Sequence, residues 1–262
     1  MEEIKLSLEK DCNIVEVGYG YEQFGKYMFA RNRYIPNGAI NEFVNQRNQY
    51  SAFCSTFRYN TTDIDNSLMY GDMYFDFDDV TNFERVRKDA IVVMNMIEVV
   101  FLIKKDLLRI YYSGHKGVHI YIPAEIMGVT PSAELNKIYK YIANLAKGFT
   151  PNKTVDTQVY DSKRLFRIAN TRHEKSGLYK IPITYEELQT LSIEQIKEIA
   201  TKPRYLQQQV SGMLPNANRA YLKVIEEYTR AEVQNAKNSK KRYAKTFTFV
   251  PPCIQHILDN GA

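Results

Sequence analysis

Apolar residues recur every three or four positions in several long segments of the chain, and they alternate with polar residues in several short ones. The first pattern is typical of helices with one buried face, and the second of strands with one buried face. The helical pattern is clearest over residues 82–103 and 131–147. Weaker helical patterns predict helices over residues 21–31, 185–188, 193–200 and 216–234.

The strand-like segments are short and rich in aromatic and β-branched side chains. They cover residues 51–59, 73–78, 107–112, 118–122, 154–160, 164–168 and 178–183. Glycine stands at both ends of the joint between 107–112 and 118–122, which predicts a tight hairpin turn. The order strand, helix, hairpin, helix and further strands predicts an α+β fold, an α/β sandwich built on an antiparallel sheet.

The composition fits a globular protein with a substantial core, since 44% of the 262 residues are hydrophobic and 25% are charged. No segment reaches the roughly 18 uninterrupted apolar residues of a membrane span. The first residues lack the basic-then-apolar pattern of a signal peptide. We therefore expect a cytoplasmic protein without a membrane partner. The net charge of +5 is compatible with a polyanionic partner.

Two aspartates occupy alternate positions of the strand predicted at 73–78. Asp76 and Asp78 therefore share one face of this strand, and two phenylalanines share the other. The carboxylates lie roughly 6.6 Å apart along the strand, from a rise of about 3.3 Å per residue. Because carboxylates are costly to bury without compensation, and because their oxygens suit Mg²⁺ or Mn²⁺, the pair is a candidate metal site. An acidic turn at the end of the strand is the alternative.

The hairpin that follows carries several groups that could bind phosphate. A turn bounded by Gly114 and Gly117 can present backbone N–H groups to an anion. Ser113 adds a hydroxyl, Lys116 adds a positive charge, and His119 could donate to a phosphate oxygen. Their convergence on one short hairpin favours phosphate binding over an ordinary hairpin with a solvent-facing lysine and a packed histidine.

A third group of candidates begins at Asp156, which stands among β-favouring residues and could complete the metal site. Arg164 and Arg167 follow three positions apart, so in a regular strand they point to opposite faces. We expect Arg167, which has apolar neighbours, to enter the site and hold a phosphate with its planar guanidinium. Arg164 is at least as well explained by solvation or by contact with a template backbone.

Together and in this order, the three segments resemble the three motifs of archaeo-eukaryotic primases. Y-F-D-F-D at 74–78 is similar to the first motif, S-G-H-K-G-V-H at 113–119 to the second, and V-D-T-Q-V-Y with K-R-L-F-R-I-A-N at 155–170 to the third. The second motif looks like that of the polymerase domains of bacterial end-joining ligases, and the third looks more like primase-polymerases. The zinc-binding insertion of many small primase subunits has no counterpart, which favours a plasmid, phage, defence-linked or repair primase-polymerase.

The resemblance implies a core sheet like that of an RNA-recognition motif, flanked by an N-terminal α/β module and C-terminal helices. It implies a DNA primase and DNA polymerase that uses two Mg²⁺ or Mn²⁺ ions, NTP or dNTP, and single-stranded DNA template or primer–template. It assigns the catalytic and metal-binding roles to Asp76, Asp78 and Asp156. The nucleotide-binding residues that we expect are Ser113, Gly114, Lys116, Gly117, His119, Arg164, Arg167 and Asn170.

We expect the catalytic core to span residues 1–236, with the motifs between 71 and 185. Residues 237–262 are expected to form a basic linker and the start of a missing C-terminal region. Cys253 follows two prolines and resembles the start of the iron–sulfur region after some primase cores, although an ordinary tail cysteine explains it as well. One such cysteine cannot supply four ligands, so no cluster is expected within this chain. The chain is expected to be a monomer, or part of a longer chain or a multi-protein complex.

Other function classes stay open at this point. A two-metal nuclease also uses clustered carboxylates, and an end-joining type of polymerase would fill gaps without priming. A non-catalytic RNA-binding module could use the same sheet, but Asp76 and Asp78 on one face would repel RNA phosphates unless metal intervenes. The sequence leaves the preference between ribonucleotides and deoxyribonucleotides open.

Overall fold

The computed structural model describes residues 11–207 and 212–246, with side chains up to residue 237. The chain divides into two compact units, Met1–Tyr221 and Leu222–Ala262. The first unit holds two antiparallel sheets and every residue predicted for the site. No helix in the described ranges is long and apolar enough to cross a membrane.

The first sheet joins the N-terminal strands to one strand from the middle of the chain. Its strands follow the order β5, β4, β1, β3, β9, and β2 also pairs with β1. Helix α2 (Ile40–Gln46) packs two apolar side chains against β1 and β3. The strands are β1 (Ile14–Gln23), β2 (Lys26–Pro36), β3 (Ala52–Ser55), β4 (Arg58–Tyr59), β5 (Met69–Tyr70) and β9 (Leu165–Arg167).

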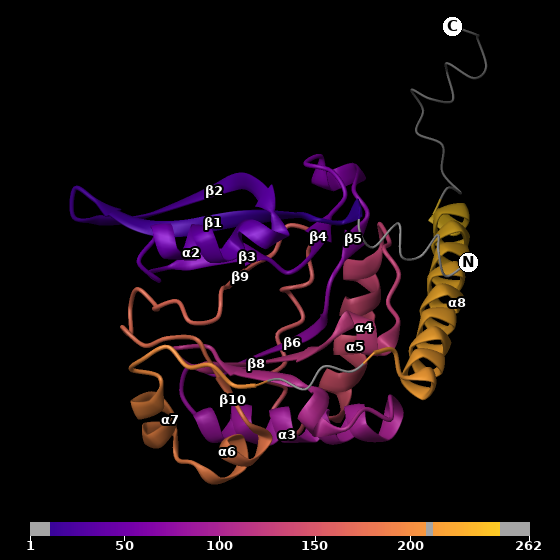
Figure 1. The fold of residues 1–262 in the computed structure, drawn as a ribbon. Helices are drawn as coiled ribbons and strands as arrows, with labels where there is room; N and C mark the ends of the chain where they lie inside the picture. The colour runs from indigo at the N-terminus through magenta and orange to yellow at the C-terminus, as the bar shows by residue number, and fades with distance from the viewer. Residues whose placement is uncertain (1–10, 208–211, 247–262) are drawn as a thin grey trace, which may run out of the picture. The chain divides into compact units, whose positions relative to one another are not determined.

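The second sheet has the order β10, β7, β8, β6. Helix α3 (Phe83–Val100) runs along one face of this sheet (Figure 1), and α5 (Leu135–Phe149) packs against α3 and β6. The apolar face of β6 and the buried face of α3 form the core between them. The strands are β6 (Met73–Asp78), β7 (Arg109–Tyr112), β8 (Gly117–Ile122) and β10 (Ile181–Ile183).

Shorter elements complete the described chain. Helices α6 and α7 both begin with a capping box, in which a hydroxyl and a Glu or Gln side chain satisfy the free backbone N–H groups of the first turn. The remaining elements are α4 (Ala124–Met127), α6 (Tyr185–Thr190), α7 (Ile193–Ile199), α8 (Pro215–Thr246), η1 (Asn37–Ala39), η2 (Ile64–Asn66) and η3 (Lys105–Leu107).

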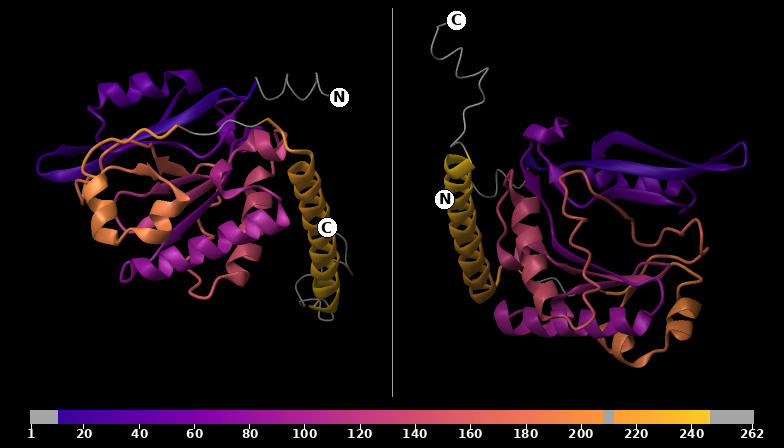
Figure 2. Two further views of the ribbon diagram at one scale, coloured as in Figure 1. Left: turned by 60° about the horizontal axis from the view of Figure 1, so that its bottom comes forward. Right: turned by 180° about the vertical axis from the view of Figure 1, so that it is seen from behind.

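The two sheets form separate layers within the first unit, as Figure 1 and Figure 2 show. Phe166 of β9 lies between the layers, with its ring centroid 5.1 Å from that of Tyr74 and 4.8 Å from that of His119. One face of β6 and β8 is therefore directed toward the first sheet. This inner face carries the polar residues of the second sheet.

The predicted α+β class and the α/β sandwich are confirmed by this architecture. The predicted strands at 73–78, 107–112 and 118–122 correspond to β6, β7 and β8, and the long helices at 82–103 and 131–147 correspond to α3 and α5. The likeness of the sheet to an RNA-recognition motif stays a prediction.

The helix predicted over residues 21–31 is wrong, because these residues form the end of β1 and the start of β2. Phe24 and Gly25 make the turn, with positive φ angles of 52° and 70°. A two-residue turn with positive φ at both positions matches the twist of paired strands. Long-range pairing along the whole hairpin therefore overrides the weak helical spacing of this segment.

Two other segments differ from the expected pattern. Residues 154–160 form no regular strand, and only Val155 makes a bridge, which is antiparallel to Phe77. The segment then turns, because the backbone N–H of Gln158 donates to Asp156 Oδ1 at 2.8 Å. Residues 237–246 continue helix α8, so the expected linker has a helical backbone up to residue 246. Cys253 lies outside the described residues, and the boundary at residue 236 stays a prediction.

Candidate active site

Asp76 and Asp78 lie on the inner face of β6, while their phenylalanine neighbours are fully buried on the opposite face. The strand register pairs Asp76 with His119 and Asp78 with Gly117. Gly117 has to be glycine, because a Cβ there would stand 2.4 Å from the backbone oxygen of Phe77, as well as 2.3 Å from Asp78 Oδ1. The close pairing of β6 with β8 thus brings the predicted D-x-D strand and the predicted hairpin together.

Asp156 reaches the same face from a distant part of the chain. Its backbone N–H donates to Asp76 O at 2.8 Å, and the N–H of Asp78 donates to Thr154 O at 3.1 Å. Val155 lies between these bonds and is buried beside the phenylalanine side of β6. Because side chains alternate along an extended segment, Asp156 points to the face that carries Asp76 and Asp78.

The segment that carries Asp156 is held by a buried aspartate on helix α3. Asp89 is fully buried, and its two carboxylate oxygens accept four hydrogen bonds. The donors are the backbone N–H and side-chain amide of Asn152 and the backbone N–H and hydroxyl of Thr154, at 2.8–3.0 Å. Such bonds to a carboxylate are stronger than neutral ones. Asp89 therefore fixes the position of residues 152–156 against β6.

Replacing Asp89 by alanine is expected to lower the free energy of unfolding by roughly 3–5 kcal/mol, because it leaves several buried donors without an acceptor. Asp89→Asn keeps one acceptor oxygen and should cost less. Urea unfolding measures both variants, and hydrogen exchange at residues 152–156 should become faster. An Asp89→Ala protein within about 1 kcal/mol of wild type would contradict the anchoring role.

The hairpin between β7 and β8 is closed by Ser113. Its hydroxyl accepts from the backbone N–H of Gly117 at 3.0 Å and of His115 at 3.4 Å. Gly114 adopts a φ of 86°, in the left-handed region that favours glycine. Ser176 Oγ donates to Gly114 O at 2.5 Å, so the turn is packed against the segment that follows β9. These bonds hold the hairpin in place beside the aspartates.

A lysine and a histidine of the hairpin each contact one of the aspartates. Lys116 Nζ lies 3.0 Å from Asp78 Oδ2, and both side chains are about one-third exposed. His119 Nε2 lies 3.2 Å from Asp76 Oδ1, with both side chains nearly buried. Even so, Asp76 Oδ1 and His119 Nδ1 have no partner with hydrogen-bond geometry. Asp76 therefore has a buried carboxylate oxygen that the protein alone does not satisfy.

Burial is the main cause that shifts the pKa values in this cluster. It lowers the pKa of His119 below its usual value, with help from the charge of Lys180 and against the attraction of Asp76. The imidazole is thus neutral at pH 7. Burial and then the neighbouring Asp76 raise the pKa of Asp78, whereas Lys116 opposes this rise. Added positive charge would relieve the repulsion between the carboxylates.

The three aspartates are suited to binding a divalent cation, because they are carboxylates and because they lie on the same face of the second sheet. Carboxylate oxygens are the usual ligands of Mg²⁺ and Mn²⁺, and Asp76 Oδ1 is buried without a hydrogen-bond partner. However, within the described residues no three carboxylate, imidazole or thiol groups converge into a ready metal cage. Lys116, His119 and the N–H of Gln158 each contact one of the aspartates instead. The donors are present, but their side chains are turned to other partners.

The two arginines are oriented in the reverse of the expected way. Phe166 points inward, so its neighbour Arg167 points to the outer face of β9, where it lies 4.5 Å over the ring of Phe53 and pairs with Glu174. Arg164 Nη2 instead donates to Gln158 O at 3.1 Å, in the turn that follows Asp156. Arg164 Nη2 also pairs with Asp161 Oδ2 at 2.7 Å. A phosphate contact by either residue stays a prediction.

Asn170 has a structural role in this state. It adopts a positive φ of 60°, its backbone N–H donates to Lys180 O, and its side-chain oxygen accepts from the backbone N–H of Arg204 at 2.9 Å. These bonds join three segments behind the site. The predicted nucleotide contact of Asn170 has no counterpart among these bonds and stays a prediction.

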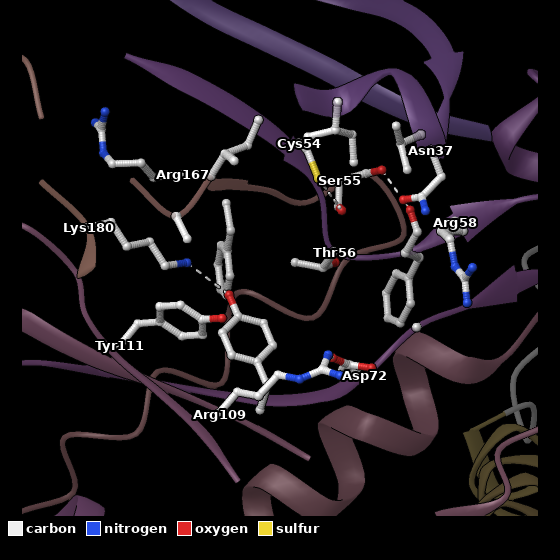
Figure 3. Close-up of a pocket in the computed structure, with 18 of the residues that line it drawn as sticks. Asn37, Cys54, Ser55, Thr56, Arg58, Asp72, Arg109, Tyr111, Arg167 and Lys180 are labelled. Atoms are coloured by element: carbon white, nitrogen blue, oxygen red, sulfur yellow. Dashed lines mark hydrogen bonds and ion pairs between the residues drawn. The ribbon is translucent and has the colours of Figure 1, made fainter. Parts of the chain in front are cut away.

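Lys180 is a charged residue of the site that the sequence reading missed. Its side chain is 3% exposed, and Nζ donates to the Tyr121 hydroxyl at 3.0 Å. In Figure 3 this ammonium points into the cavity, whereas the guanidinium of Arg167 points away from it. Burial lowers the pKa of Lys180 to about 7, although Asp76 raises it. The only signal in the sequence was a lone charge within an apolar strand.

The cavity beside Lys180 has a volume of about 480 Å³ and lies between the two sheets. Tyr111 and Tyr121 line it from the second sheet, and Cys54 and Phe166 line it from the first. An ion pair between Arg109 Nη1 and Asp72 Oδ2, at 2.7 Å, stands at its other end (Figure 3). This volume is within the usual range of small-molecule sites.

Comparison with known proteins identifies the fold. No family model and no curated protein matches the chain. Among solved structures, the chain is similar to the polymerase domain of Mycobacterium tuberculosis ligase D in complex with DNA, with a TM-score of 0.51 and 12% identity over 87% of this chain and 85% of that one. The AEP domain of the cyanophage S-2L primase-polymerase is similar with a TM-score of 0.39 and 15% identity over 68% of this chain and 85% of that one. Of these two similarities, the one to the ligase D polymerase domain is close enough to show that the fold is shared.

Proposed function

From the fold shared with the ligase D polymerase domain, we propose that this chain is a template-directed nucleotidyltransferase that acts on DNA. One observation carries the proposal. Asp76 and Asp78 of β6 and Asp156 of a distant segment lie on one face, and the hairpin beside them carries a lysine and a histidine. Clustered carboxylates next to cationic groups suit the transfer of a nucleotidyl group from a triphosphate, with pyrophosphate as the leaving group.

In this proposal Asp76, Asp78 and Asp156 hold two divalent cations. The cations would activate a primer 3′-hydroxyl and neutralise the charge that develops on the triphosphate. The three aspartates fix where the reacting groups meet, because their backbones are hydrogen-bonded to one another or held through Asp89. To bind the cations, Asp78 and Asp76 would release Lys116 and His119, and Asp156 would release the backbone N–H of Gln158.

The released side chains of the hairpin are the proposed triphosphate ligands. Lys116 would exchange the carboxylate of Asp78 for a phosphate oxygen, so no charge is left unpaired in either state. Neutral His119 can donate one N–H to an oxygen of the triphosphate while Phe166 holds its ring. Lys180, from the cavity, adds a second positive charge. The adjoining cavity of about 480 Å³ is the proposed place for the sugar and base of the nucleotide.

An extension assay tests the proposal. The protein is incubated with labelled primer–template or single-stranded template, Mg²⁺ or Mn²⁺, and ribo- or deoxyribonucleotides. Lengthening that depends on nucleotide, metal and template is expected, and new chains on unprimed template would establish priming. Degradation of the primer with metal alone would identify a nuclease. No change of the DNA under any of these conditions would refute nucleotidyl transfer.

Replacing His119 by alanine is expected to raise the KM for nucleotide about tenfold or more, the value of one hydrogen bond to a charged group. Affinity for the DNA should stay within about twofold, because the residue is buried between the sheets. Steady-state extension at varied nucleotide concentration measures the effect, and Lys140→Ala, at an exposed position of α5, is the control. An unchanged KM would remove His119 from the nucleotide site.

A further inference from the structure

A second groove lies on the first sheet, at the end of helix α2. It has a volume of about 530 Å³ and is open to solvent. Three tyrosines and two arginines form most of its wall, and the lining residues are Tyr19, Gly20, Tyr21, Glu22, Gln46, Arg47, Asn48, Tyr50 and Arg172. None of the three predicted motifs falls within this groove, so the groove is separate from the proposed nucleotidyl-transfer site.

The two arginines of the groove are held on aromatic rings and have no acidic partner. Arg47 Cζ lies 3.6 Å from the ring centroid of Tyr19, and Arg172 Cζ lies 5.4 Å from that of Tyr50. Within the described part of the chain neither side chain makes an ion pair, and Arg47 Nε is buried without a hydrogen-bond partner. Glu174, two residues after Arg172, is already paired with Arg167. Glu22 also lines the groove, but no ion pair joins it to either arginine, so both guanidinium groups are available to a phosphate.

The backbone around the groove is fixed in an unusual conformation. Gln49 and Ser51 have positive φ angles of 55° and 43°. The N–H of Ser51 donates to Arg172 O at 2.9 Å, and the N–H of Arg172 donates to Gln49 O at 2.6 Å. These bonds join the loop after α2 to the segment after β9. Positive φ in non-glycine residues costs free energy, so the arrangement is held in place by its surroundings.

Residues next to the groove contact the hairpin of the active site. Arg172 is followed by His173, whose ring stacks on that of His115 with centroids 4.9 Å apart and planes at 17°. His115 precedes Lys116, which pairs with Asp78. A row of cationic and aromatic groups thus runs from the aspartates, over the hairpin, to Arg172 and Arg47.

We propose that this groove binds a single-stranded segment of nucleic acid that leads to the active site. Tyrosine faces stack on bases without regard to sequence, and arginines beside them pair with the phosphates. The inference deepens the proposed function and rests on it, since the strand in question is the template.

Binding is measured by fluorescence anisotropy of a labelled, mixed-sequence single-stranded DNA, without metal or nucleotide. The double variant Arg47→Ala/Arg172→Ala is expected to bind about tenfold more weakly or worse. The slope of log Kd against log salt should fall by about 1.4, from 0.7 per phosphate contact on a single strand. The double variant Lys88→Ala/Lys140→Ala removes the same charge from exposed positions of α3 and α5 and should bind almost as wild type does.

Two further variants distinguish a loss of DNA contacts in the groove from a loss of folding. Arg172→Glu reverses an exposed charge and leaves the packing of Arg47 intact, and it should weaken binding at an unchanged melting temperature. Tyr50→Leu should weaken binding with an unchanged salt slope, because it removes stacking and no charge. If wild type and Arg172→Glu bound DNA equally well, the proposed binding of nucleic acid in the groove would be wrong. The proposed nucleotidyl transfer would not be affected by that result. Displacement of the DNA by millimolar nucleoside monophosphate would show that free nucleotide is the ligand and would also overturn it.

Discussion

Replacing Asp76 by asparagine is expected to reduce nucleotide addition by at least about a thousandfold while the protein stays folded. Asp76 lies at the centre of the inner face, paired in register with His119 and hydrogen-bonded through its backbone to Asp156. Its buried oxygen without a hydrogen-bond partner is the group that a cation would satisfy. Asparagine keeps the shape of the aspartate side chain but removes its negative charge, so the expected loss of activity comes from weaker metal binding.

The same change should leave the melting temperature equal or higher, because a buried carboxylate without full compensation destabilises the folded state. Single-turnover extension and thermal unfolding give the two readouts, and anisotropy reports DNA affinity, which should be unchanged. Asp106→Asn, at an exposed position before β7, is the matched control and should keep full activity. Extension by Asp76→Asn within tenfold of wild type would reject the role of this aspartate.

Replacing Lys180 by methionine is expected to weaken nucleotide binding by about tenfold to a hundredfold, since a charge-assisted contact contributes roughly 1.5–3 kcal/mol. Lys180 is buried in the cavity and bonds to Tyr121, and no carboxylate of the described residues lies within ion-pair distance. A phosphate would supply the missing anion. The KM for nucleotide should rise, whereas Lys140→Met, at an exposed position of α5, should leave it unchanged.

The same variant should be more stable than wild type at low pH, because methionine removes a buried charge. The pKa of Lys180 is about 7 in the folded protein and close to 10.5 when unfolded. Between these values the unfolded chain binds more protons, so the stability of wild type rises with pH. The advantage of Lys180→Met should therefore be largest below pH 7 and shrink toward pH 10. Urea unfolding at pH 6 and pH 9 measures it, and a constant difference would show that Lys180 is not buried as a cation.

The sequence predicted the parts of the site that depend on local pattern. Alternation within Y-F-D-F-D determines that Asp76 and Asp78 share a face, and two glycines determine the hairpin that brings Lys116 and His119 to them. Both features need only a strand and a turn, so they can be read from a few consecutive residues. The sandwich also follows from the order of such elements.

The parts that depend on long-range contacts were beyond the sequence. Arg167 was expected in the site, but the inward position of Phe166 against His119 turns it outward to Glu174. Asp89 has the spacing of the buried face of α3, three residues after Val86 and four before Val93, but its partners in residues 152–154 come from a distant segment and could not be read from the pattern. Lys180 gains its role because the first sheet covers it. Each of these outcomes is decided by which face of one element another element covers.

The central claim is that Asp76, Asp78 and Asp156 turn together onto divalent cations when a nucleotide binds. Anomalous diffraction from crystals of the protein with Mn²⁺, a non-reactive nucleotide and primer–template locates the cations directly. We expect two manganese peaks beside these three carboxylates, with Lys116 and His119 moved onto the triphosphate. Manganese bound elsewhere, or a nucleotide seated with Asp78 still paired to Lys116, would contradict the account.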